Sequence, residues 1–190
     1  MAQHYAGLIR GRLAGRSECL VGGWSIGGVI AFEVARQLIA SGTSVPGLVL
    51  IDSPDPETTT ALSDEVLDAA FSTKSSPSRA MELARLSIQH ATAALVDYDP
   101  WSSPARHVLL AKAVILRSRE GFFVKNAKLG VQPDAFLGDR ASPETIIRGW
   151  EKILGIRVPV LDIPGNHFEV FDRRYVGEVS NRLLEALRML

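Results

Sequence analysis

The chain has 190 residues, 21 Lys and Arg against 21 Asp and Glu, and a hydrophobic fraction of 46%. This length suits a single soluble globular domain, and the balanced charge argues against nucleic acid or a membrane surface as a partner. The single cysteine, Cys19, excludes an internal disulfide and a cysteine-based zinc site. The first residues hold no apolar signal-peptide core, and we therefore expect a cytoplasmic protein.

Short apolar runs alternate with helical patterns along the chain, which is typical of parallel β-α-β units. One helix is expected over residues 2–13. Glu18–Trp24 is an apolar run that ends in a glycine turn and predicts the first strand. In Ile26–Ser41, apolar residues recur at spacings of three and four, which predicts a helix that Gly42 ends. Leu48–Ile51 predicts the second strand.

The same alternation continues through the second half of the chain. Ala113–Leu116 and Val158–Ile163 predict two more strands, and Asp172–Leu190 predicts a closing helix with its apolar residues on one side. A helix before the last strand has an N-cap, a first-position proline, an acidic first turn and a glycine stop: Ser142, Pro143, Glu144 and Gly155. The expected fold class is α/β, with about four parallel strands and flanking helices.

A long segment, Glu57–Arg106, separates the second predicted strand from the third. It carries two helical patterns joined by Ser72–Pro77. The second pattern has one apolar stripe, formed by Met81, Ala84, Ile88, Ala91 and Leu95. Two interpretations stay open at this point: helices packed on the sheet, or a mobile lid over a site.

The strongest local motif is a G-x-S-x-G sequence at Gly23–Gly27, between a predicted strand and a predicted helix. Such a strand-turn-helix is a nucleophile elbow, which exposes the hydroxyl of Ser25. We expect a Cβ at position 23 or 27 to clash with neighbouring backbone. The helix N-terminus favours an oxyanion, and the main-chain N–H of Ile26 is expected to bind it. The alternative, a glycine-rich phosphate-binding turn, lacks the P-loop lysine and the G-x-G-x-x-G spacing.

A serine hydroxyl needs a base to become a nucleophile, and the base needs a carboxylate to orient it. His167 follows the last predicted strand, where catalytic groups gather in open α/β sheets, and it is the candidate base. The other histidines fit less well. His4 precedes the serine, His90 lies inside a helical pattern, and His107 lies beside a strand start.

The candidate acid is Asp52, which directly follows the second predicted strand. Asp55 lies on the same loop and is its rival, whereas Asp162 lies inside the last strand pattern. Two further aspartates lie at the end of the long helical pattern: Asp97 and Asp99. The alternative for Asp52 is a structural one, in which its side chain only caps the turn before Ser53 and Pro54.

Four segments in the same order resemble a known family: GGWSIGGVIAFEVARQL, GLVLIDSPDP, GWEKILG and PGNHFEVF. They resemble the type I thioesterase domains that end polyketide synthases and nonribosomal peptide synthetases, and above all those of fungal polyketide synthases. The resemblance runs from about Gly7 to the end of the chain. It implies an α/β-hydrolase fold, a catalytic triad of Ser25, Asp52 and His167, and a helical lid at about residues 57–106.

The resemblance also implies a reaction. Ser25 would attack an acyl thioester carried on the phosphopantetheine of an acyl carrier protein or peptidyl carrier protein. The resulting acyl-enzyme would be released by hydrolysis or cyclisation, so that a polyketide or peptidyl chain leaves the carrier. No metal ion and no bound cofactor are expected.

The sequence departs from the family at its amino-terminal end. The elbow strand is normally the fifth of the fold, and here only one helix is expected before it. We therefore expect residues 1–190 to form an amino-terminally truncated domain with a partial α/β-hydrolase fold. The loop that supplies a second oxyanion donor is not found, and the elbow strand would be an exposed sheet edge that can pair with another chain.

Two other functions are considered beside the thioesterase. The first is a general carboxylesterase that uses the same three residues on simple esters. The second is a catalytically inactive, truncated domain that acts only as a binding module, an interpretation that the missing oxyanion loop supports.

Overall fold

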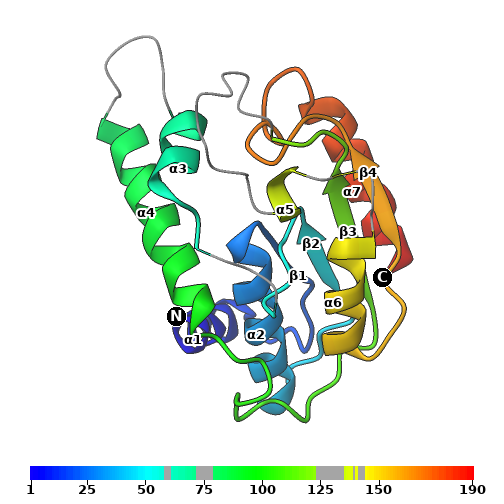
Figure 1. Cartoon of the computed structure of the whole chain (residues 1–190). Helices are drawn as coiled ribbons and strands as arrows, with labels where there is room; N and C mark the ends of the chain where they lie inside the picture. Colours follow the sequence, from blue (N-terminus) through cyan, green and yellow to red (C-terminus); the bar gives the residue numbers. More distant parts are fainter. Residues whose placement is uncertain (58–60, 72–78, 123–134, 139, 141–143) are drawn as a thin grey trace.

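A parallel β-sheet forms the centre of the protein. The structure, a computed structural model, describes residues 1–57, 61–71, 79–122, 135–138, 140 and 144–190 (Figure 1). In these residues the four strands lie in the order β1 (Val21–Trp24), β2 (Leu48–Ile51), β3 (Ala113–Ser118) and β4 (Val160–Ile163). Every neighbouring pair is parallel. The prediction of four parallel strands is confirmed.

Three strand boundaries differ from the predicted ones. β1 begins at Val21, because Glu18 makes only an isolated bridge to Ser44. β3 continues to Ser118 instead of stopping at Leu116, and β4 begins at Val160 instead of Val158. Strand ends are set by pairing with neighbours, which a hydrophobic run in one segment does not encode.

The two faces of the sheet bury different residues of the same strands. Leu48, Leu50 and Ile115 join one core cluster, whereas Val49 and Val114 join the other. Side chains alternate along a strand, so a strand covered on both faces needs an unbroken apolar run. This explains why Leu48–Ile51 has no polar residue.

Helices cover both faces. The first face packs against α2 (Ile26–Ala40) and α6 (Glu144–Leu154), and α1 (Ala2–Arg12) packs on α2 in the same core; the second face packs against α7 (Val176–Met189). The remaining helices are α3 (Asp64–Phe71), α4 (Arg79–Val96) and the short α5 (Ala135–Gly138). No helix in the described residues has the length and apolarity needed to cross a membrane.

Glycine ends two helices as predicted. Gly42 follows α2 with φ +89°, and Gly155 follows α6 with φ +68°, a left-handed backbone that glycine adopts without strain. Glu144 lies in the first turn of α6 as expected, whereas the closing helix begins at Val176 instead of Asp172. Ser142 and Pro143 lie outside the described residues.

The segment between β2 and β3 contains α3 and α4, which lie together at one side of the molecule, away from α7 (Figure 1). Arg85 on α4 joins the two helices through ion pairs with Asp64 and Asp68. Of the predicted apolar stripe on α4, only Leu95 is fully buried. The predicted joint at residues 72–77 lies outside the described residues.

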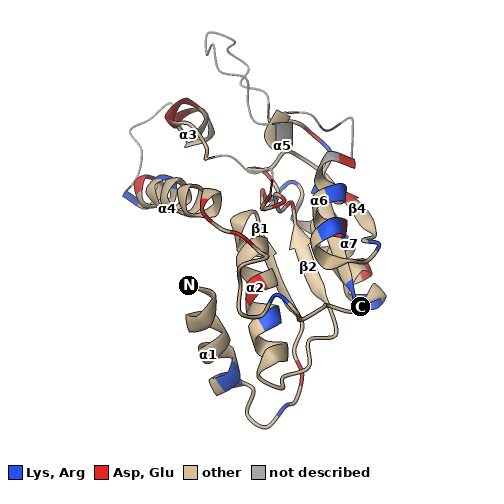
Figure 2. Ribbon diagram, turned by 60° about the horizontal axis from the view of Figure 1, so that its bottom comes forward, with Lys and Arg blue, Asp and Glu red and all other residues tan. Residues whose placement is uncertain are grey.

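Charges of both signs are mixed over the surface helices. Figure 2 shows basic and acidic residues side by side on α4 and on α6. On α6, for example, Arg148 pairs with Glu144 four residues before it. This mixture fits the balanced composition, and neither helix presents a surface on which all charges have the same sign.

A buried ion pair on α2 anchors the chain that follows α4. Arg36 donates to the carbonyl oxygens of Pro100 and Ala105, both at 2.8 Å. Glu33 accepts from the Tyr98 hydroxyl at 3.1 Å and from the Ser103 hydroxyl at 2.7 Å. Burial and the Glu33 charge raise the pKa of Tyr98, so the phenol stays protonated and donates.

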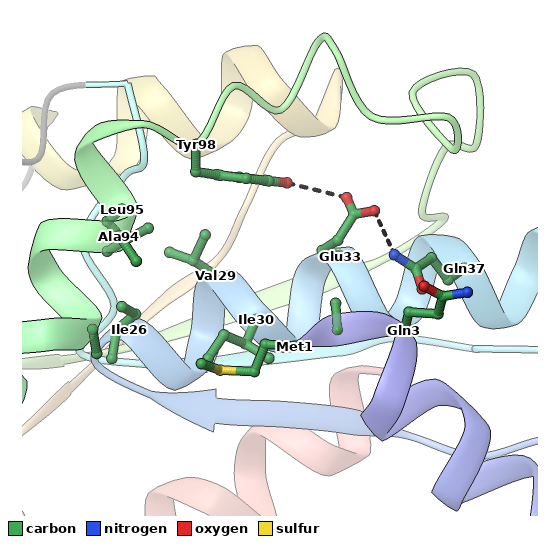
Figure 3. Close-up of a pocket in the computed structure, with 12 residues that line it drawn as sticks. Met1, Gln3, Ile26, Val29, Ile30, Glu33, Gln37, Ala94, Leu95 and Tyr98 are labelled. Atoms are coloured by element: carbon green, nitrogen blue, oxygen red, sulfur yellow. Dashed lines mark hydrogen bonds between the residues drawn. The ribbon is translucent and has the colours of Figure 1, made fainter. Parts of the chain in front are cut away.

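An apolar cavity of about 330 Å³ lies beside this pair, between α1, α2 and α4 (Figure 3). Its apolar lining includes Ile26, Val29 and Leu95, and polar side chains line the opposite end: Gln3, Glu33 and Gln37. Ile26 belongs to the G-x-S-x-G motif, so the cavity borders the first turn of α2.

β1 lies at one edge of the sheet in the described residues, as predicted, and pairs only with β2. Leu20, just before β1, is 45% exposed. Pairing of this edge with another chain stays a prediction.

Trp150 should be a main anchor of α6 on α2 and on the loop after β2. It is fully buried, meets the Phe32 ring edge-on at 5.7 Å and donates its indole N–H to the Ser53 carbonyl oxygen at 3.1 Å. Trp150→Phe removes this bond and leaves unfilled volume, so we expect the free energy of unfolding to fall by about 1–3 kcal/mol in urea titrations.

Trp101→Phe is the matched control. Trp101 is 46% exposed and donates its indole N–H to Glu57. Water replaces a lost exposed bond, and we expect a change within about 0.5 kcal/mol. Equal effects of the two substitutions would contradict the anchoring role of Trp150.

Candidate active site

The candidate residues of the sequence meet at one edge of the sheet. Ser25 follows β1, Asp52 follows β2, Ser118 ends β3, and His167 lies on the loop after β4. Because all strands are parallel, their carboxyl ends meet at the same edge, where polar side chains from distant segments come together.

Ser25 occupies a strained turn between β1 and α2. Its φ is +55° and its ψ is −133°, a region that non-glycine residues rarely adopt. Such strain costs on the order of 1–3 kcal/mol and persists only when surrounding contacts hold it. Ser25 donates its N–H to the Ile51 carbonyl at 2.9 Å, and its carbonyl accepts from the Ser53 hydroxyl at 2.7 Å.

The glycines around this turn have different roles. A Cβ at Gly23 would overlap the backbone of Gly27, and one at Gly28 would overlap the Ser53 side chain. At Gly27 a Cβ would find open space within 4 Å. The expected clash is confirmed at Gly23 and wrong at Gly27. At Gly27 the crowding comes from its backbone, which lies against Gly23, and not from the direction in which a side chain would point.

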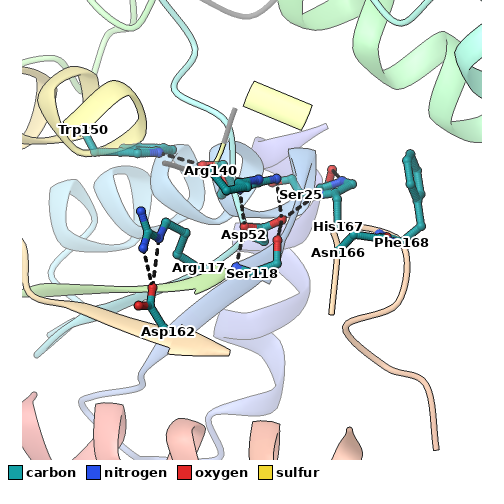
Figure 4. Close-up of polar contacts among 11 residues, drawn as sticks. Ser25, Asp52, Arg117, Ser118, Arg140, Trp150, Asp162, Asn166, His167 and Phe168 are labelled. Atoms are coloured by element: carbon teal, nitrogen blue, oxygen red, sulfur yellow. Dashed lines mark hydrogen bonds and ion pairs between the residues drawn. The ribbon is translucent and has the colours of Figure 1, made fainter. Parts of the chain in front are cut away.

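His167 connects Ser25 to Asp52 (Figure 4). Its Nε2 lies 2.9 Å from Ser25 Oγ, and its Nδ1 lies 2.8 Å from Asp52 Oδ2. An ionised carboxylate only accepts hydrogen bonds, so Nδ1 carries the proton and donates it to Asp52. The lone pair of Nε2 then faces the Ser25 hydroxyl, which is the arrangement of a base beside its nucleophile.

Asp52 is fully buried and satisfied by donors from three segments. Oδ1 accepts from the Ser118 N–H at 2.9 Å, and Oδ2 accepts from the Ser118 hydroxyl at 2.6 Å. Arg140 donates to both oxygens, at 3.0 and 3.2 Å. Burial alone would raise the pKa of Asp52, but the bond from His167 and the charge of Arg140 bring it below its ordinary value. Asp52 is therefore a carboxylate at neutral pH.

Aromatic rings enclose the imidazole, which is 3% exposed. Trp24 stacks on His167 with ring centres 5.2 Å apart, and Phe136 and Phe168 meet it edge-on at 5.3 and 5.0 Å. Phe168 in turn meets Phe71, the last residue of α3, at 6.0 Å. The rings fix the plane of the imidazole and bring α3 beside the site.

The rival residues lie elsewhere. His4, His90 and His107 are exposed and lie outside the cluster that Ser25, Asp52 and His167 form with Ser118 and Arg140. Asp162 pairs with Arg117 at 2.8 Å, and the Asp55 carboxylate accepts the N–H of Glu57. The remaining two candidates follow α4 and are exposed: Asp97 and Asp99.

Two residues of the cluster were not predicted. Ser118 was missed because the third strand was expected to end at Leu116, so its position at a strand end was hidden. Arg140 lies in a segment without periodic pattern or motif, and nothing in the sequence connects it with Asp52.

Ile26 begins α2, so no intrahelical carbonyl can accept its main-chain N–H. Its role as an oxyanion donor stays a prediction.

In residues 1–57, all of which are described, β1 is the first strand. The described part of the chain holds no cluster of His, Cys, Asp or Glu suited to a metal ion.

Comparison with known proteins gives one consistent family. A family model described as "Thioesterase domain" matches residues 1–186. Orsellinic acid synthase of Beauveria bassiana is 32% identical over 98% of this chain, which spans only 10% of that protein. Thioesterase frbD of Dothideomycetidae sp. is also 32% identical over 98% of this chain, which here spans 70% of the relative.

Solved structures share the fold. The NocB thioesterase domain, in a covalent complex with a fluorophosphonate nocardicin G analogue, has a TM-score of 0.68 and 21% identity, over 98% of this chain and 73% of that one. The surfactin-cyclising thioesterase domain SrfTE has a TM-score of 0.62 and 20% identity, over 98% and 73%. At these identities the likeness concerns the fold alone.

Gly23 and Gly27, the two glycines of the motif, should respond differently to an added methyl group. Gly23→Ala forces the turn of Ser25 apart, and we expect it to lower the free energy of unfolding by about 2–4 kcal/mol. Gly27→Ala has room and replaces a helical glycine, so it should be neutral or stabilise by up to about 1 kcal/mol. Denaturant unfolding of both variants checks this, and a Gly27→Ala loss as large as that of Gly23→Ala would contradict it.

Proposed function

The chain belongs to the thioesterase domain family, and we propose that it cleaves an acyl thioester through an acyl-enzyme intermediate on Ser25. The observation that supports this most is the unbroken hydrogen-bond chain from Ser25 through His167 to Asp52, at 2.9 and 2.8 Å. These are the distances that a nucleophile, its base and the orienting acid need.

In the proposed acylation step, Ser25 Oγ attacks the thioester carbonyl carbon while its proton moves to His167 Nε2. The carbonyl oxygen becomes an oxyanion, which the N–H of Ile26 at the start of α2 would stabilise. The oxyanion then collapses and the carbon–sulfur bond breaks. The leaving thiolate takes the proton from Nε2, so His167 ends the step neutral and Ser25 carries the acyl group.

Asp52 would serve this step in two ways. It keeps the Nδ1 proton of His167 in place, so the lone pair of Nε2 points at Ser25. It also offsets the positive charge that forms on the imidazole when the serine proton arrives. The lowered pKa of Asp52 supports both roles, because the carboxylate is charged at neutral pH.

We infer the substrate class from relatives. The matched part of orsellinic acid synthase lies within a much longer synthase, since this chain spans a tenth of it. A carrier-bound acyl chain on phosphopantetheine, held by an acyl or peptidyl carrier protein, is therefore the proposed substrate. Release would follow by attack of water, of a substrate hydroxyl or of a substrate carbon nucleophile on the acyl-enzyme.

We also propose that residues 1–190 act as one thioesterase unit in which residues 57–106 are a lid. The contact of Phe71 with Phe168 supports this, because Phe168 follows the base directly in sequence. Leu83 and Leu86, 55% and 44% exposed, leave apolar surface on α4 that a bound acyl chain would cover, or that would be buried when the lid closes over the site.

A fluorophosphonate probe tests the nucleophile. We expect wild type to gain the mass of one phosphonyl group, which is the probe less HF, and Ser25→Ala to gain none. Asp52→Asn should slow labelling by about 10²–10⁴-fold, because the orienting carboxylate is lost. Asp162→Asn is the control, since its carboxylate faces Arg117, and its rate should stay within about twofold of wild type.

A folded chain that takes up no probe would contradict the proposal and favour an inactive binding module. The thioester preference needs its own comparison, of an acyl N-acetylcysteamine thioester with the ethyl ester of the same acid. We expect a higher kcat/KM for the thioester. Equal or higher values for the ethyl ester would point to a carboxylesterase.

A further inference from the structure

Arg140 makes direct contact with the carboxylate that orients the base. Its two terminal nitrogens lie 3.0 Å from Asp52 Oδ1 and 3.2 Å from Asp52 Oδ2. The guanidinium side chain is 3% exposed and the carboxylate is completely buried. A planar guanidinium that donates to both oxygens fixes the plane of the carboxylate as well as its position.

Arg140 and His167 bind the same oxygen of the Asp52 carboxylate. Asp52 Oδ2 accepts from Arg140 and from His167 Nδ1, the latter at 2.8 Å. A rotation of the carboxylate that broke the contact with Arg140 would also displace the bond to His167. The orientation of the imidazole toward Ser25 therefore depends on how the carboxylate is held.

One short stretch of chain contacts both partners. The Arg140 guanidinium lies over the Phe136 ring at 4.9 Å, and Phe136 meets the His167 ring edge-on at 5.3 Å. Residues of this stretch thus touch the acid and the base together. The Arg140 side chain stays in this position although its Nε is buried without a hydrogen-bond partner among the described residues. A buried donor without a partner lowers stability.

We propose that Arg140 is a positioning residue for acyl transfer, which holds the Asp52 carboxylate in the orientation that directs His167 at Ser25. This inference rests on the proposed function for its effect on catalysis. Its effect on the carboxylate itself can be measured independently of activity.

The same chain offers a matched arginine–carboxylate pair outside the site. Arg117 binds Asp162 through a single oxygen, Oδ1, at 2.8–2.9 Å. The Asp162 side chain is 44% exposed and the Arg117 side chain 10%. Arg117→Gln removes a guanidinium of similar burial without touching Asp52, so it serves as the control.

The pH dependence has a defined sign. The charged or titratable groups that hold the Asp52 carboxylate are His167, from the loop after β4, and Arg140, beyond α5. The Arg140 charge is one cause of the lowered pKa of Asp52, so Arg140→Gln should raise that pKa. The Asp52 carboxyl of the variant should therefore take up its proton at a higher pH than that of wild type.

The test measures the rate of fluorophosphonate labelling at Ser25 at neutral pH and the ¹³C NMR titration of the Asp52 carboxyl toward acidic pH, with folding checked by circular dichroism. Arg140→Gln should label about 10–100-fold more slowly than wild type, and its Asp52 carboxyl should titrate at higher pH. Arg140→Lys keeps the charge without the planar pair of donors, so its rate should be intermediate and its Asp52 titration close to that of wild type. Arg117→Gln should behave as wild type.

A folded Arg140→Gln variant with a labelling rate within twofold of wild type and an unchanged Asp52 titration would overturn the proposal. If this variant does not fold, Arg140→Lys decides. A loss of at least about fivefold at an unchanged melting temperature supports positioning by the planar pair of donors, and a rate within twofold of wild type contradicts it.

The failure of the proposed function would be recognised separately, because wild type itself would then show no labelling at Ser25. In that case the ¹³C NMR titration of the Asp52 carboxyl, assigned with Asp52→Asn, still tests the inference. A titration that moves to higher pH in Arg140→Gln supports the hold on the carboxylate, and an unchanged titration overturns it.

Discussion

The buried carboxylate of Asp52 is the interaction on which the site depends. A charge removed from water costs several kcal/mol unless donors surround it, and here they come from β3, from Arg140 and from the loop after β4. These segments are distant in sequence, and the need to satisfy one carboxylate brings them to one place. The orientation of His167 toward Ser25 follows from that arrangement.

The parallel sheet makes this meeting geometrically feasible. All four strands deliver their carboxyl ends to one edge, and β2 and β3 bury apolar residues on both faces. Ser25 and Asp52 both have positive φ, at 55° and 43°, at the ends of adjacent strands. The packed sheet and the hydrogen bonds around these two residues hold backbone conformations that the residues alone would not adopt.

The residues with a local signal could be predicted, and those defined only by tertiary contact could not. Ser25 was expected at the site because an elbow has a fixed sequence pattern, Asp52 because it directly follows a predicted strand, and His167 because it lies on the loop after the last predicted strand. Ser118 was missed because β3 is longer than its apolar run, and Arg140 because no local pattern connects it with Asp52. The role of Gly27 was misjudged, since the direction of an added Cβ depends on the folded turn and not on the motif.

The proposed nucleophile is tested most directly by mixing the wild-type chain with an acyl N-acetylcysteamine thioester, quenching in acid and locating the acyl group by peptide mass spectrometry. We expect one acyl group on the peptide that contains Ser25, formed faster at neutral pH than at a pH below the pKa of Asp52. A folded chain that stays unmodified, or one acylated at another residue, would contradict it.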